Sequence, residues 1–162
     1  FVALGRKSYF YRERVLGGGT DVLINDEYRG DVNGEEEAYE VIEKELGITP
    51  LRLGYMPSEM VFEDFELWDG YAKIKFLYKN DIIYFIQSKY EKPASYKIDA
   101  DSTYNNIVFS KWLNKEVKIE KEDHGDSSVR YAASFVFEGS YYSMIGNIEE
   151  SEFSKIIERL TL

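Results

Sequence analysis

Residues 61–87 decide the fold, and they read VFEDFELWDGYAKIKFLYKNDIIYFIQ. Over residues 71–79 apolar side chains alternate with mostly polar ones, so that one face of the segment is apolar and the other carries lysines. A period of two predicts a β-strand with one solvated face. The Asp-Gly pair at 69–70 and the Asn-Asp pair at 80–81 break the pattern and are typical of short hairpin turns. Strands joined by such turns predict an antiparallel meander. Its three strands are 61–68, 71–79 and 82–87.

The same kind of pattern continues downstream. Apolar and β-branched runs separated by polar turns predict four more strands. These strands are 107–112, 116–120, 129–137 and 141–146. A Glu-Gly pair at 138–139 predicts the turn between the last two of them, which therefore form a hairpin.

Upstream, strand-like runs at 8–15 and 21–24 flank three glycines at 17–19. This arrangement predicts a hairpin or a loose β-ribbon across a glycine turn. Glycine-rich loops also cradle phosphates, but that motif needs a lysine followed by serine or threonine. Here Thr-Asp follows at 20–21, so we interpret the glycines as a turn.

Two segments carry apolar residues at helical spacing, 34–46 and 149–160. The first begins with three glutamates and is followed by Gly47, and both features are favourable at the corresponding helix ends. The apolar stripe of the second consists of Phe153, Ile156, Ile157 and Leu160. We therefore predict an α+β fold, with both amphipathic helices packed against a mostly antiparallel twisted sheet. We expect residues 1–162 to form a single domain, with 1–33 as an N-terminal hairpin or extension.

Composition excludes several classes of function. The 162 residues contain 20 Lys and Arg against 30 Asp and Glu, so the net charge is −10 at pH 7. A chain this acidic lacks the basic footprint of a nucleic-acid-binding protein, and its overall charge disfavours anionic membrane surfaces. The chain contains no cysteine, which excludes disulfides, thiolate catalysis and iron–sulfur clusters. We expect no nucleic-acid partner and no membrane insertion by this fragment.

Candidate catalytic residues are few. The single histidine, His124, lies in a polar loop between Asp123 and Asp126, and we interpret it as a surface residue. No Gly-x-Ser-x-Gly motif occurs, and one histidine limits any triad. Carboxylate pairs at glycosidase-like separation arise by chance among so many acidic residues, and no pattern singles one out. We therefore predict that the protein is not an enzyme and has no catalytic residue.

One segment resembles the start of a calcium-binding loop. Asp99, Asp101 and Thr103 are spaced as the first ligands of that loop would be. The motif also needs glycine at its sixth position and glutamate at its twelfth, where Tyr104 and Ser110 stand. We interpret the segment as a turn with capping aspartates, and we predict neither a metal nor a cofactor.

Tyrosine is the most suggestive residue type, with 14 copies. Residues 9–11 read YFY, and Tyr141 and Tyr142 form a later pair. Tyrosine suits binding faces because it combines apolar area with a hydrogen-bonding tip. It is also a good strand former, and one member of each pair is expected to point inward. Both interpretations, packing and a binding groove, stay open on the residues alone.

The second half resembles the domain-of-unknown-function 4367 family over about residues 47–161. Residues 53–57 (LGYMP), followed by Met60, are similar to the family's Tyr-x-Pro motif before its first strand. Residues 82–87 (IIYFIQ) resemble its strand ending in glutamine, and 141–147 (YYSMIGN) resemble its Tyr-Tyr strand ending in glycine. The acidic, isoleucine-rich end is similar to its terminal helix. The sequence departs from the family at 112–117, where a small glycine-containing turn is expected.

The resemblance implies a location rather than a mechanism. It implies an extracytoplasmic domain of Gram-positive bacteria, anchored by one spanning helix and sometimes linked to a cytoplasmic segment of anti-sigma-factor type. Residues 1–7 would then be the edge of a spanning helix that precedes Phe1, although an ordinary first strand explains them equally well. The family has no established activity.

We therefore expect a non-enzymatic extracytoplasmic sensing or binding module, whose partner is an envelope or membrane protein. The alternative is a carrier or binding domain for a small apolar or glycan ligand, which would use the concave side of the sheet and the spare tyrosines. A hydrolase that uses paired carboxylates is the third hypothesis.

Overall fold

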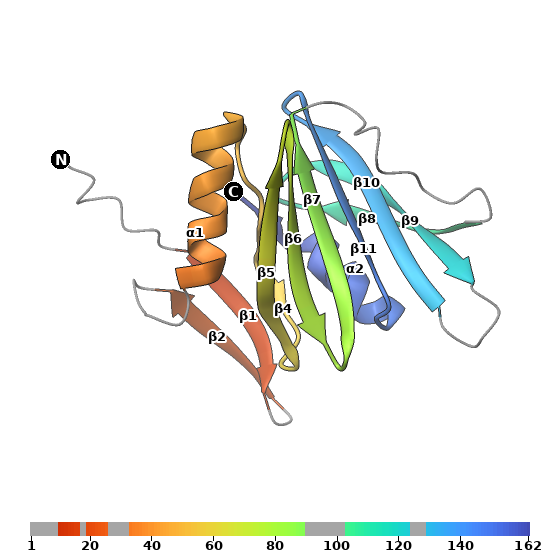
Figure 1. Ribbon diagram of the computed structural model, residues 1–162. Coiled ribbons are helices and arrows are strands. Elements are labelled where there is room, and N and C mark those ends of the chain that lie inside the picture. The colour runs from red at the N-terminus through yellow and green to blue at the C-terminus, as the bar shows by residue number, and fades with distance from the viewer. Residues whose placement is uncertain (1–9, 17–18, 26–32, 90–102, 124–128) are drawn as a thin grey trace.

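A seven-stranded antiparallel sheet forms the centre of the protein (Figure 1). The fold comes from a computed structural model that describes residues 10–16, 19–25, 33–89, 103–123 and 129–162. The strand order is β5-β6-β7-β11-β10-β9-β8. The strands are β5 (Met60–Trp68), β6 (Tyr71–Tyr78), β7 (Asp81–Ser88), β8 (Thr103–Ser110), β9 (Lys115–Asp123), β10 (Val129–Phe137) and β11 (Ser140–Gly146). The predicted meander is confirmed as β5, β6 and β7, and its last strand pairs with the distant β11.

The register of the sheet aligns apolar residues into a continuous row across six strands. Directly paired residues in this row are Phe65, Ile74, Phe85, Met144, Ala133 and Ile119. All but the partly buried Phe65 are at most 1% exposed. Because side chains alternate between the two faces of a strand, this row marks the face of the sheet that contacts the core.

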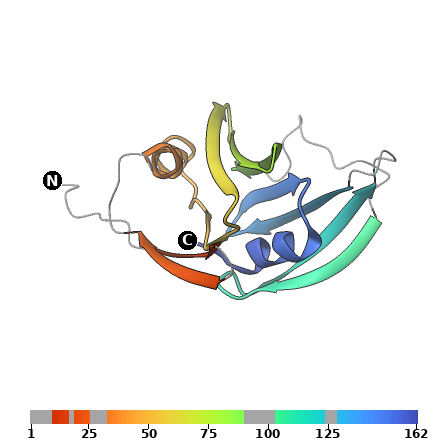
Figure 2. The ribbon, with the colours of Figure 1, turned by 90° about the horizontal axis from the view of Figure 1, so that it is seen from below.

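Both helices contribute to the same buried cluster as this face of the sheet. Helix α1 (Asn33–Val41) continues into a π-helical turn, η3 (Ile42–Leu46), and ends at Gly47, whose φ of +70° is a left-handed conformation that suits glycine. Helix α2 (Glu150–Glu158) lies in the hollow of the curved sheet, which bends around it in Figure 2. Helix α1 contacts β5, η3 contacts β6, and α2 contacts β8 and β10.

Two smaller sheets complete the described fold. Strands β1 (Phe10–Leu16) and β2 (Gly19–Asn25) form the predicted antiparallel hairpin, and β1 also pairs in parallel with β4 (Tyr55–Met56). Strand β3 (Arg52–Leu53) pairs with β12 (Leu160–Thr161). Through β12, the residues after α2 are fixed beside the segment that leads into β5.

The α+β class and the positions of both helices are confirmed, and several boundaries differ from the prediction. The last turn of the first helix is π-helical, and α2 ends at Glu158, because Leu160 pairs with Leu53 in a sheet. The strand predicted at 107–112 runs from 103 to 110 instead, which leaves Trp112 in the turn. Asn114 closes that turn at φ +54°, the conformation for which a glycine was expected.

Buried hydrogen bonds tie residues 49–51 to the sheet. The Gln87 side chain is fully buried, accepts a hydrogen bond from the Leu51 amide at 3.0 Å and donates one to the Leu51 carbonyl at 2.8 Å. The Tyr142 hydroxyl donates to the Thr49 carbonyl at 2.6 Å. Residues 49–51 lie in no helix or strand, so their backbone groups need other partners, and these two side chains hold the segment beside the sheet.

We predict that Phe153→Ala lowers the free energy of unfolding by about 3–5 kcal/mol, because Phe153 is fully buried and truncation leaves a cavity. Urea denaturation followed by circular dichroism measures the change. Ser151→Ala, on the exposed side of α2, is the control and is expected to have little effect. A loss of the same small size in both variants would contradict the central position of α2.

Candidate functional site

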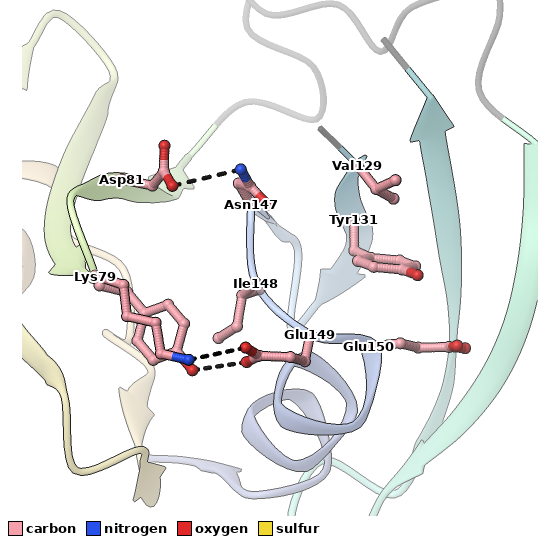
Figure 3. Close-up of a pocket in the computed structure, with 9 residues that line it drawn as sticks. Lys79, Asp81, Val129, Tyr131, Asn147, Ile148, Glu149 and Glu150 are labelled. Atoms are coloured by element: carbon pink, nitrogen blue, oxygen red, sulfur yellow. Dashed lines mark hydrogen bonds and ion pairs between the residues drawn. The ribbon is translucent and has the colours of Figure 1, made fainter. Parts of the chain in front are cut away.

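A polar pocket of about 310 Å³ lies where three segments of the chain meet (Figure 3). These segments are the β6–β7 turn, the beginning of β10 and the loop from β11 to α2. The lining residues are Tyr78, Lys79, Asp81, Val129, Tyr131, Asn147, Ile148, Glu149 and Glu150. The pocket is therefore built by residues that are far apart in sequence and come together at one end of the sheet.

The β6–β7 turn forms one wall of the pocket. Its two central residues, Lys79 and Asn80, have φ angles of +51° and +79°. Positive φ at both central residues is the signature of a type I′ turn, which matches the twist of antiparallel strands. The turn places Lys79 and Asp81 at the pocket.

Glu149 is the centre of the hydrogen-bond network at the pocket. It is the N-cap residue of α2, so its position follows from the seating of that helix. Its carboxylate accepts hydrogen bonds from the Tyr78 hydroxyl at 2.6 Å and from Lys79 Nζ at 3.1 Å. Lys79 Nζ also lies 3.7 Å from a carboxylate oxygen of Glu59. One carboxylate thereby links the start of α2 to the end of β6.

This network holds three side chains in their ordinary ionisation states. Burial and the hydrogen bond to Glu149 raise the pKa of Tyr78 to about 12, so its hydroxyl stays protonated. The hydrogen bonds to Glu149 and Tyr78 raise the pKa of Lys79. The hydrogen bonds from Tyr78 and Lys79 lower the pKa of Glu149 against the effect of its burial. At neutral pH the network contains a neutral phenol, an ammonium and a carboxylate.

The opposite wall comes from β10 and the first turn of α2. The Tyr131 ring packs on Phe153, with 6.2 Å between the ring centroids. Burial, and to a smaller extent the charge of Glu150, raise the pKa of Tyr131. Asn147 Nδ2 donates to Asp81 at 3.4 Å and so connects the loop from β11 to α2 with the β6–β7 turn (Figure 3). The pocket thus has aromatic walls, three carboxylates and one ammonium group.

Of the candidate residues from the sequence, none that the structure describes lines this pocket. His124, Asp99, Asp101 and Tyr9 fall outside the described residues. Thr103 begins β8. Tyr141 and Tyr142 point to opposite faces of β11, yet their exposed fractions are only 5% and 0%, so neither is available to line a groove. In the described part of the chain, no three acidic or histidine side chains gather closely enough to hold a metal.

The sequence analysis missed the residues that build the pocket. Tyr78 and Glu149 are 71 positions apart, and no motif connects them. A tyrosine before an Asn-Asp turn and a glutamate before a terminal helix are common features individually. Only the pairing of β7 with β11 brings the two segments together.

The fold and the pocket define an α+β domain with a curved antiparallel sheet, a helix in its hollow and a polar pocket at one end. Residues 50–160 match a family described as Domain of unknown function (DUF4367), and the chain belongs to this family. Comparisons with curated proteins and with solved structures find no match. In the described residues no helix has the length and apolar character needed to cross a bilayer.

The family motifs have structural roles in this fold. A Cβ atom on Gly54 would lie 2.4 Å from the Arg159 carbonyl oxygen, and the Gly54 amide donates to that oxygen at 2.9 Å. A Cβ atom on Gly146 would lie 2.5 Å from a side-chain carbon of Ile83. Gln87, through its bonds to Leu51, and these two glycines therefore have structural roles in this chain, because each makes or permits a close contact.

We predict that Glu149→Gln reduces the pH dependence of stability below about pH 4.5, the ordinary pKa of the carboxyl group. A carboxylate whose pKa is lowered in the folded state contributes stability above its unfolded pKa, and the contribution is lost as the pH falls through the folded value. Urea denaturation across this range measures the effect. Glu43→Gln, on the exposed surface of η3, is the control, and equal slopes for wild type and Glu149→Gln would contradict the prediction.

Proposed function

We propose that this protein is a non-enzymatic binding module, and that the pocket at the β6–β7 turn is its recognition site. The observation that carries the proposal is the network around Glu149. General acids and bases work best with pKa values near the working pH, whereas Tyr78, Lys79 and Glu149 all shift away from neutrality. The three groups are already hydrogen-bonded to one another, and each keeps its protonation state near neutral pH. Such an arrangement suits recognition of a partner rather than proton transfer.

The chemistry of the pocket favours a positively charged group on the partner. Asp81, Glu149 and Glu150 outnumber Lys79, and the Tyr78 and Tyr131 rings supply aromatic walls. Carboxylates and aromatic faces both attract ammonium and guanidinium groups. We propose a protein partner that presents a lysine or arginine side chain. The resemblance to the family supports an extracytoplasmic setting behind a membrane anchor, with an envelope or membrane protein as that partner.

A small-ligand carrier is the second candidate function. The volume of about 310 Å³ lies at the lower end of small-molecule sites, which supports a ligand of modest size. The hollow of the sheet offers less support, because α2 fills it with fully buried side chains. A carrier would therefore use the polar pocket and favour a polar or glycan ligand over an apolar one.

Photo-crosslinking tests the proposal. Benzoylphenylalanine replaces the exposed Ser151, which is adjacent to the pocket residue Glu150, in the full-length protein, expressed in cells of its own species, and the same group at the exposed Glu43 is the control. We expect one discrete protein adduct from position 151 and none from position 43. Glu150→Lys is expected to reduce the yield of that adduct about tenfold. Such a reduction corresponds to a loss of about 1.4 kcal/mol of binding free energy.

Two outcomes would contradict the proposed protein partner. The first is equal adducts from both positions, which would show nonspecific contact. The second is no adduct, combined with a bound small molecule in native mass spectrometry that Glu150→Lys removes. That second result would support the carrier instead.

A further inference from the structure

The ammonium group of Lys79 already occupies part of the pocket (Figure 3). Its Nζ atom lies 3.1 Å from one carboxylate oxygen of Glu149 and 3.7 Å from a carboxylate oxygen of Glu59. The same atom lies 5.1 Å from the centroid of the Tyr78 ring. Carboxylates and an aromatic face are the contacts that a lysine or arginine of a partner would make. The chain's own lysine therefore sits where the proposed ligand group would bind.

The position of the Glu149 carboxylate does not depend on Lys79 alone. The Tyr78 hydroxyl donates to Oε1 of Glu149 at 2.6 Å, whereas Lys79 binds Oε2. Tyr78 is 4% exposed, so this hydrogen bond starts from a buried side chain. The Glu149 backbone is held as well, because its carbonyl accepts the Phe153 amide in the first turn of α2. The carboxylate would therefore stay in place if the ammonium group left it.

The Lys79 side chain can leave the carboxylate at little cost. The side chains of Lys79 and Glu149 are 47% and 51% exposed, so water can replace the ion pair. Exposed ion pairs of this kind shift an equilibrium by about fivefold at most. The β6–β7 turn fixes the Lys79 backbone at φ +51°, but the methylene stem of lysine is flexible. A cation that makes further contacts in the pocket can therefore compete successfully with Lys79.

We propose that Lys79 is a built-in competitor at this pocket, and that a lysine or arginine of the partner binds by displacing the Lys79 ammonium group from Glu149. The inference rests on the proposed function and concerns the state of the same site before the partner arrives. In the free protein Lys79 neutralises the carboxylate, so small cations in solution bind it weakly. A side chain delivered by a wider interface overcomes this competition, and the lysine thereby favours the partner over simple cations.

Lys155 provides a matched control on α2. Its Nζ atom lies 5.4 Å from the centroid of the Tyr55 ring, and the Tyr55 hydroxyl donates to Glu152 at 2.5 Å. Lys155 thus has the same charge and the same kind of aromatic neighbour as Lys79, but it is not among the residues that line the pocket. Lys155→Met removes as much charge as Lys79→Met and leaves the contacts of the pocket carboxylate unchanged.

The test uses the peptide acetyl-Gly-Arg-Gly-amide as the probe. Calorimetric titration compares its dissociation constant for wild type, Lys79→Met and Lys155→Met. We expect Lys79→Met to bind about two- to fivefold more tightly, because the internal competitor is absent, and Lys155→Met to bind like wild type. A second measurement needs no substitution. In wild type labelled with nitrogen-15 at the lysine ammonium groups, saturating peptide is expected to shift the Lys79 resonance and to accelerate its hydrogen exchange, while the Lys155 resonance stays in place.

Three results would overturn the displacement. They are an unmoved Lys79 resonance at saturating peptide, equal gains in affinity for the two Met variants, and weaker binding by Lys79→Met. The second would show a general effect of charge, and the third would show that Lys79 helps to hold the peptide. In each case the proposed function stands if Glu150→Lys weakens peptide binding. Binding by neither wild type nor Lys79→Met would overturn the proposed recognition of a cation itself, and the displacement with it.

Discussion

The burial of one face of α2 in the hollow of the sheet is the constraint on which the rest of the structure depends. Phe153, Ile156 and Ile157 are fully buried, and each such side chain stabilises the fold by about 1.5–3 kcal/mol before entropy is counted. The sheet bends around this helix (Figure 2). Because the helix occupies the hollow, the concave face of the sheet is covered by core side chains.

The position of α2 also determines the chemistry of the pocket. Its N-cap residue, Glu149, reaches the β6–β7 turn, where a phenol and an ammonium group both bind its carboxylate. These hydrogen bonds stabilise the neutral phenol of Tyr78, the ammonium of Lys79 and the carboxylate of Glu149 at neutral pH. This wall of the pocket therefore keeps the same charges and the same geometry near neutral pH. A proton-transfer site would instead need a group whose pKa lies near the working pH.

Elements with one solvated face were predictable from the sequence, and elements defined by distant pairing were not. The alternation in β6 is clear because its lysines lie on a partly exposed face. Strand β11 was predicted as well, although Tyr141, Tyr142 and Ser143 are all buried, but its pairing with β7 was not. The two-residue strands β3 and β12 are too short for any period. Trp112 was assigned to a strand because it is apolar, although it lies in a turn. The pocket could not be predicted, because it depends on the pairing of β7 with β11.

Native-state hydrogen exchange tests most directly whether Glu149 couples the start of α2 to the β6–β7 turn. The Phe153 amide donates to the Glu149 carbonyl at 2.9 Å and so reports on the first turn of the helix. In Tyr78→Phe, which removes only the hydroxyl that binds Glu149, the account predicts faster exchange at Phe153 and unchanged exchange at Ala133 in the centre of the sheet. Unchanged exchange at Phe153, or equal acceleration at both amides, would contradict it.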